Sequence, residues 1–220
     1  MNSPAFNIRR GGFTLMELMV VVAIIAVLAA LLMPSMAKMS RNAQGSHIAS
    51  QMRQLGQAIF SYAGEHDGQL PGPLWDGQGF RYKATHPEAL MTHLSSYLGV
   101  QNSDANWRIA DQFMTPPQRA FWRKINNDSA AFLKITVSGS VIPFGYSAGA
   151  TVTASMRLQS LATPSETYMF READQKASWV SISSGYYRQC PPAPLHGDYR
   201  YISYFDGSIR PVAVKESNRQ

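Results

Sequence analysis

The sequence is poor in charged residues and contains a single cysteine. Charged side chains make up 15% of the 220 residues, hydrophobic ones 45%, and the formal net charge is +6. This composition can bury one substantial core, so it excludes an intrinsically disordered chain and favours one domain with an extension. Because Cys190 is alone, no internal disulfide can form, and we expect a small, partly buried hydrophobe rather than a nucleophile there.

Motifs for catalysis, zinc binding and nucleic-acid binding are missing as well. The sequence has no Gly-x-Ser-x-Gly nucleophile elbow, no zinc-ligand spacing, and no basic stripe. His196, Asp198 and Asp206 are the side chains that could suggest a hydrolase triad or a metal site, but no serine stands in a nucleophile motif. We therefore expect no enzyme and no cofactor, with a calcium site treated below as an alternative.

An apolar run occupies residues 13–33 and contains one charge, Glu17. At ~1.5 Å per residue, a helix of that length spans about 30 Å, the thickness of the hydrocarbon core of a bilayer. Arg9 and Arg10 precede the run and the next cation is Lys38, so the positive-inside rule places the N-terminus in the cytoplasm. The sequence predicts a single-pass helix in the cytoplasmic (inner) membrane, with all later residues extracytoplasmic.

Glu17 is costly in this run, because a carboxylate inside a membrane costs at least roughly 2.5 to 3.5 kcal/mol. A signal peptide cleaved after Ala37 would have an unusually long apolar region, and a plain membrane anchor leaves Glu17 unexplained. A cut between Gly12 and Phe13 would create an α-amino group four residues before Glu17. That amine could pair with Glu17 of the same or a neighbouring chain.

The stretch Gly12-Phe13-Thr14-Leu15-Met16-Glu17-Leu18 closely resembles the class III signal of type IV pilins and type II secretion pseudopilins. The resemblance implies that prepilin peptidase cuts after Gly12 and methylates Phe13, and that Glu17 directs assembly into a helical filament. The partners it implies are prepilin peptidase, other pilin-like subunits, a secretion or pilus assembly platform with its ATPase, and membrane lipid. Met16 departs from the more usual isoleucine but is similar in volume.

A long helix is expected to continue beyond the apolar run. Family members commonly carry a proline near the depth of Pro34, which we expect to kink a continuous helix. Apolar residues then recur every three or four positions and predict one apolar helix face: Ile48, Met52, Leu55, Ile59 and Tyr62. Packing of this face onto the chain's own sheet is favoured over a coiled coil. Glycines from Gly64 to Gly68 end the helix, and His66-Asp67 indicates a turn rather than a metal site.

The remainder predicts an α+β head with a small antiparallel sheet. Short helices are expected from Thr85 to before Gly99 and from Thr115 through Trp122. Strand-like runs, rich in β-branched and aromatic residues, occupy residues 132–137, 141–146, 167–170, 179–183, 199–205 and 208–212. The predicted organisation is therefore a leader at 1–12, a transmembrane and filament-core helix at 13–33, an amphipathic helix at 34–64, and an extracytoplasmic head at 65–220.

The last two strand-like runs flank Asp206-Gly207, which predicts a two-residue hairpin turn with positive φ at both positions. Pro211 cannot donate to a ladder, so the second arm is expected to be an edge strand. His196-x9-Asp206-Gly207 resembles the C-terminal signature of a type II secretion G-like subgroup, and the segment from Pro164 to Asp174 resembles another of its motifs. His196, Asp206 and Gly207 are expected to hold the hairpin.

Two further alternatives stay open. Pseudopilins similar to this chain often bind calcium in a C-terminal loop, so Asp198 or Asp206 could contribute to such a site, although the ligand pattern is incomplete. The resemblance favours a structural subunit of a type II secretion-like pseudopilus. The alternative is a type IV pilus-like subunit whose head binds a surface or DNA.

Overall fold

The computed structural model describes residues 14–100, 106–125, 130–135, 141–148 and 151–214. The chain divides into two compact units, and the boundary in the sequence lies between Arg41 and Asn42. Residues 42–64, most of the predicted amphipathic helix, therefore belong to the same unit as the head. The predicted leader and the cleavage pair Gly12 and Phe13 lie outside the described residues.

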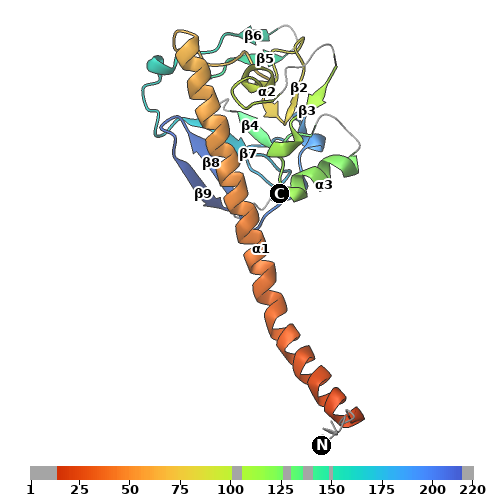
Figure 1. Cartoon of the computed structure of the whole chain (residues 1–220). Helices are drawn as coiled ribbons and strands as arrows, with labels where there is room; N and C mark the ends of the chain where they lie inside the picture. Colours follow the sequence, from red (N-terminus) through yellow and green to blue (C-terminus); the bar gives the residue numbers. More distant parts are fainter. Residues whose placement is uncertain (1–13, 101–105, 126–129, 136–140, 149–150, 215–220) are drawn as a thin grey trace, which may run out of the picture. The chain divides into compact units, whose positions relative to one another are not determined.

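Helix α1 runs from Leu15 to Glu65 as one 51-residue element (Figure 1). Its N-terminal part is long and apolar enough to cross a membrane, and the large apolar side chains between Leu15 and Met39 are exposed. The helix continues through Pro34, and the neighbouring Ser35 hydroxyl donates to the Leu32 carbonyl at 2.8 Å. The continuous helix was predicted; a kink at Pro34 stays a prediction.

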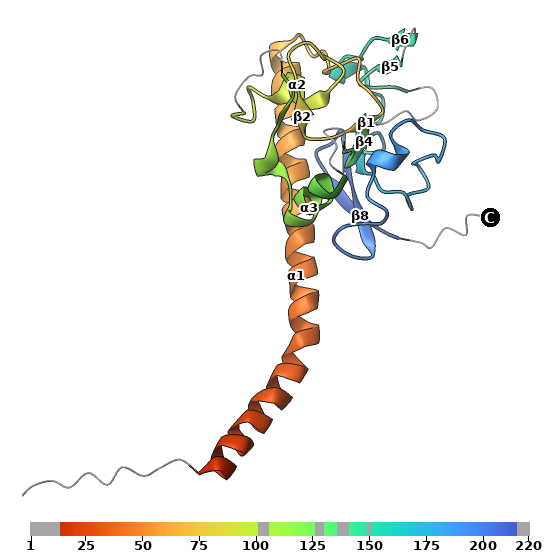
Figure 2. The same ribbon diagram turned by 90° about the vertical axis from the view of Figure 1, so that its right-hand side faces the viewer.

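The C-terminal half of α1 buries the predicted apolar face. Ile48, Met52, Leu55 and Ile59 are each at most 1% exposed and belong to the main hydrophobic core. Glycine allows a close approach here, because a Cβ on Gly45 would lie 2.2 Å from the Tyr199 hydroxyl. The helix therefore packs onto the chain's own head, as predicted, with the sheet on one side of it (Figure 2).

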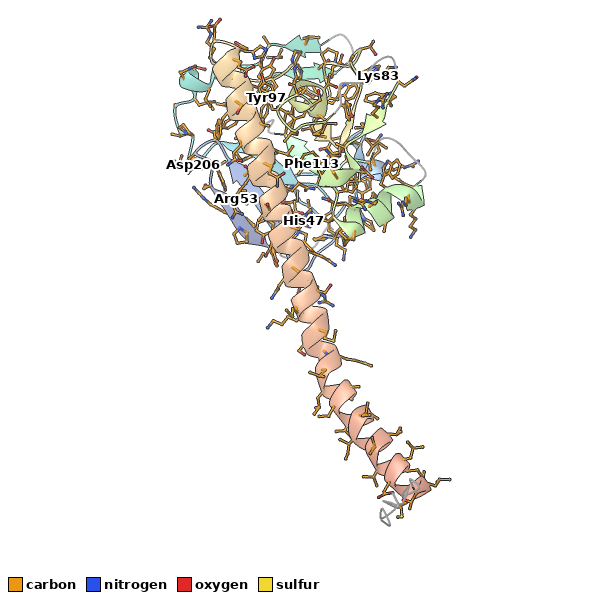
Figure 3. The ribbon with its side chains drawn as sticks, in the orientation of Figure 1. His47, Arg53, Lys83, Tyr97, Phe113 and Asp206 are labelled. Atoms are coloured by element: carbon orange, nitrogen blue, oxygen red, sulfur yellow. The ribbon has the colours of Figure 1, made fainter. Side chains whose placement is uncertain are left out.

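Turn chemistry ends α1 where the glycines predicted. Asp67 and Gly68 both have positive φ, 52° and 79°, and the Gly68 amide donates to the Ala63 carbonyl at 2.8 Å. The Tyr97 hydroxyl donates to Glu65 at 2.6 Å, and this bond raises the pKa of Tyr97 to about 12. Tyr97 lies beside the end of the helix (Figure 3), so a loop of the head fixes the last turn.

The head has a five-stranded antiparallel sheet, which confirms the α+β fold. Its strands, in spatial order, are β1 (Gly77–Gln78), β4 (Leu133–Ile135), β7 (Tyr168–Glu172), β8 (Tyr199–Tyr204) and β9 (Ile209–Ala213). Two small sheets pair β2 (Arg81–Tyr82) with β3 (Arg108–Ile109) and β5 (Tyr146–Ala148) with β6 (Thr151–Thr153).

The short helices agree with the sequence in one case and differ in the other. Helix α3 (Pro116–Ile125) begins where predicted, and Thr115 and Gln118 hydrogen-bond to each other's backbone amides there. The helix predicted from Thr85 is α2 (Leu90–Leu94), which begins later because residues 84–88 form turns. The 3-10 helices are η1 (Asp111–Phe113), η2 (Leu158–Ser160) and η3 (Tyr187–Gln189).

Two predicted strands are wrong. Within residues 141–146, the Gly145 amide donates to the Ile142 carbonyl in a turn, and strand β5 begins only at Tyr146. Residues 179–183 form turns, with Val180 buried in a small second core. Phe144 and Val180 are buried in the two cores, and a short apolar run of this kind has the same composition whether it forms a strand or a buried turn.

The β8–β9 hairpin exists, but its turn differs from the prediction. The Tyr204 amide donates to the Ser208 carbonyl and the Gly207 amide to the Tyr204 carbonyl, so the loop is residues 205–207. Only Gly207 has positive φ, 81°, whereas a two-residue turn needs two such positions. Strand β9 is an edge strand, as predicted. Pro211 lies opposite Tyr201 in a non-hydrogen-bonded pair, so the ladder needs no amide from Pro211.

Candidate functional site

The first turn of α1 holds Glu17 in a reciprocal pair with Thr14. The Thr14 amide and hydroxyl donate to Glu17 Oε2 at 2.9 and 2.8 Å, and the Glu17 amide donates to the Thr14 hydroxyl at 3.2 Å. This is a capping box, in which the side chains at the N-cap and at N3 satisfy each other's free amides. Glu17 therefore has a local partner that the sequence analysis missed.

The Thr-x-x-Glu spacing could have revealed this pair, because it is the sequence signature of a capping box. Cleavage after Gly12 would leave the Thr14 peptide amide intact, so the cap would remain in a processed chain. Both bonds fall on Oε2. Within the part of the chain that the structure describes, Glu17 Oε1 has no hydrogen-bond partner, so it can pair with a cation.

The comparison with known families bears on this segment. Residues 7–33 match the family model described as the prokaryotic N-terminal methylation motif. The matched segment carries the start of a long apolar helix, and that helix packs onto an antiparallel sheet. The architecture is pilin-like. No curated protein and no solved structure matches the chain, so the head of this pilin-like chain must be understood from its own geometry.

His196 is buried in the head and binds β7. Its Nε2 donates to Glu172, at 2.8 Å from Oε1 and 2.9 Å from Oε2, and the Tyr201 amide also donates to Oε2 at 2.6 Å. At the end of the β7–β8 pairing, the Glu172 side chain thus accepts the Tyr201 amide in place of a backbone carbonyl. The sequence analysis placed His196 at the hairpin; its partner is instead on the neighbouring strand, which only the sheet order could show.

Asp206 caps the hairpin turn. Its Oδ1 accepts the Ser208 amide at 2.8 Å, and its Oδ2 lies 3.3 Å from Arg210 Nη2. Hydrogen bonds from Ser208 lower the pKa of Asp206, and the Arg210 charge adds to this. Asp206 lies at the margin of the head (Figure 3), and Gly207 supplies the positive φ that the turn requires.

The structure gives no support for a metal cluster in the described ranges. Among those residues, no group of three or more His, Cys, Asp or Glu side chains is placed to hold a metal ion. The calcium site at Asp198 or Asp206 stays a prediction. Cys190 is fully buried, and burial raises the pKa of its thiol to about 12, so this thiol is not a nucleophile near neutral pH.

Asp174 and Arg200 form a buried ion pair between the segment after β7 and strand β8. Arg200 Nη2 donates to Asp174 Oδ1 at 2.8 Å and its Nε donates to Oδ2, while the guanidinium carbon lies 5.5 Å from the Trp179 ring centroid. Asp174 is 2% exposed and Arg200 4%. The sequence analysis noted Asp174 only within a family motif and missed Arg200, because their pairing depends on the sheet.

Proposed function

We propose that this chain is a structural subunit of a type II secretion-like pseudopilus. The observation that supports the proposal is the methylation-motif match at residues 7–33, which coincides with the start of an exposed apolar helix. In this proposal prepilin peptidase cuts between Gly12 and Phe13. The helix then serves first as a membrane anchor and later as the shaft of a filament. The segments from Pro164 to Asp174 and from His196 to Gly207 resemble motifs of a type II secretion G-like subgroup. This resemblance supports the secretion assignment.

Exposed apolar surface is the physical basis of this assembly. Leu15 is 78% exposed and Leu31 70%, and the large apolar side chains between them are all exposed. A continuous apolar surface of this kind is stable only against lipid or against other apolar helices. Contacts between neighbouring subunits can therefore replace lipid contacts when a subunit leaves the membrane.

Glu17 would supply the register of assembly. Thr14 offsets part of the cost of the carboxylate while the subunit is in lipid, because it satisfies Oε2. Oε1 is then the group that would accept the Phe13 amine of a neighbouring chain. A carboxylate and an amine that meet only in the filament would favour one axial position of the subunit over others.

Mass spectrometry of the mature N-terminus tests the processing step. The expected product begins with a methylated Phe13. A chain that begins at Met1, or at Lys38 after signal-peptide cleavage, would contradict the proposal. The control is Gly12→Val, which places a bulky side chain at the cleavage site and should leave the full chain in the membrane.

Two substitutions separate the charge of Glu17 from its capping role. Glu17→Gln keeps a side chain that can complete a capping box but removes the charge, so we expect membrane insertion without filament incorporation. Thr14→Ala keeps the charge and removes the cap, so we expect incorporation to persist. Cross-linking of subunits in membranes and in sheared filaments measures both. Equal incorporation of Glu17→Gln and the unchanged chain would refute the pairing.

The distinction between a pseudopilus and a pilus needs a different observation. A type IV pilus-like subunit whose head binds a surface or DNA is the second candidate. Neighbouring genes for a secretion channel would support the first candidate. Genes for retraction and for pilus-tip proteins would support the second.

A further inference from the structure

The head contains a cavity of about 520 Å³ beside strand β1. Residues 75–79 line one side of it, and residues 183–186 together with Gln189 line the other. Helix η3 lies near β1 and β4 (Figure 2), and the volume falls in the range of small-molecule sites. None of the described residues of the matched segment, 14–33, lines this cavity.

The wall of the cavity is held in place by packing and by hydrogen bonds. A Cβ on Gly77 would lie only 2.5 Å from Tyr186 Cγ, so the tyrosine ring rests directly on the backbone of β1. The Tyr186 hydroxyl donates to Asp76 Oδ2 at 3.0 Å, and Lys134 Nζ lies 3.2 Å from the same oxygen. Burial, with Asp76 nearby, raises the pKa of Tyr186, so this donor stays protonated. The cavity is therefore formed before any ligand arrives.

Aromatic rings supply much of its apolar surface. Trp75, Tyr146 and Tyr186 line the cavity. The Arg81 guanidinium carbon lies 5.7 Å from the Trp75 ring centroid and 4.2 Å from that of Trp107. These cation–π contacts hold Arg81 and the two indoles in one arrangement. The cavity thus presents fixed flat rings rather than flexible aliphatic chains.

Polar groups are interspersed with the rings, and their charges balance. Among the described residues, the charged ones that line the cavity are Asp76 and Arg81, one of each sign. Donors and acceptors without charge come from Ser147, Ser183, Ser184 and Gln189. A polyanion such as nucleic acid needs several cations, which this lining lacks. Asp76 Oδ1 is buried and has no hydrogen-bond partner within the ranges that the structure describes, and a purely apolar ligand would leave it without one.

We propose that this cavity binds a neutral saccharide. A sugar ring has an apolar face of C–H groups that can lie on an aromatic ring, and a rim of hydroxyls that both donate and accept hydrogen bonds. These two features match the fixed rings and the uncharged polar groups of the lining. The inference concerns the head alone and does not rest on the proposed filament role.

Calorimetric titration of the full-length chain in lauryldimethylamine oxide micelles tests the proposal, since a detergent with a sugar headgroup would compete. The probes are cellohexaose and the hexamer of N-acetylglucosamine, with oligothymidine as the polyanion. Gly185→Phe should block the cavity, because Gly185 lines it and a Cβ there meets no atom within 4 Å. Gly64→Phe is the matched control: it is equally open and lies on α1. Ser183→Phe is a second blocking variant.

We expect at least one neutral hexasaccharide to bind. Its affinity should fall by about tenfold or more in both blocking variants and stay unchanged in Gly64→Phe. Circular dichroism checks that each variant is folded. Absence of binding by both hexasaccharides would overturn the proposal. So would unchanged affinity in a folded blocking variant, or binding of oligothymidine that the blocking variants abolish.

Discussion

Replacing Asp174 by asparagine should destabilise the head strongly, because Arg200 would keep its charge in a buried site. Both residues are at most 4% exposed, and two hydrogen bonds join them. Loss of one partner of a buried pair costs about 3 to 5 kcal/mol in free energy of unfolding. For a chain of this size, roughly 2 to 4 °C in melting temperature accompanies each kcal/mol, so we expect a decrease of roughly 6 to 20 °C.

The assay is thermal unfolding followed by near-ultraviolet circular dichroism, which reports packing of aromatic rings such as Trp179. Asp206→Asn is the matched control. It makes the same chemical change at an exposed turn, where an ion pair is worth less than about 1 kcal/mol. The double variant Asp174→Leu with Arg200→Met removes both charges and should recover most of the lost stability.

A decrease for Asp174→Asn no larger than that for Asp206→Asn would refute this reasoning, because it would mean that Arg200 regains water or another partner. A double variant as unstable as the single one would also contradict it. In that case the cost would come from lost packing rather than from an unpaired charge.

Three further predictions concern the core, the thiol and the sheet edge. Met52→Ala should lower the free energy of unfolding by about 2 to 5 kcal/mol in denaturant titration, since Met52 is fully buried; a smaller loss would mean that the core collapses around it. Cys190 should react with a maleimide at pH 8 roughly a thousandfold slower in the folded than in the unfolded chain. Between about pH 9 and pH 12 the thiol of Cys190 is ionised in the unfolded chain but protonated in the folded chain. Its contribution to the free energy of unfolding is therefore fully present below about pH 9 and is lost as the pH rises towards 12, and Cys190→Ala should lack this pH dependence. Pro211→Val should add an outward-facing amide to β9 and increase self-association in sedimentation velocity without weakening the hairpin; unchanged sedimentation would contradict the edge argument.

Several features were predictable because local chemistry encodes them. The apolar stripe from Ile48 to Ile59 needs only the period of a helix, and α3 needs only Thr115 and the prolines that follow. The Thr14–Glu17 cap was equally readable from its spacing, although the sequence analysis overlooked it. The hairpin was found from Asp206-Gly207, but the choice between a two-residue and a three-residue loop depends on φ at single positions.

Other features depended on which strands become neighbours. Segments 141–146 and 179–183 have the composition of strands, yet they form turns that bury Phe144 and Val180 in the two cores without adding a strand to the five-stranded sheet. The same order of strands decides that His196 meets Glu172. No spacing along the chain indicates a bond between residues 24 positions apart.

The sequence by itself determined the pilin-like start, the apolar helix with Glu17 in its first turn, and the α+β class, because charge order, hydrophobic period and turn residues act over a few positions. The tertiary structure alone decided the Asp174–Arg200 pair and the cavity beside β1. Both arise where distant segments meet, and the free energy of such contacts depends on the whole arrangement of strands rather than on any local pattern.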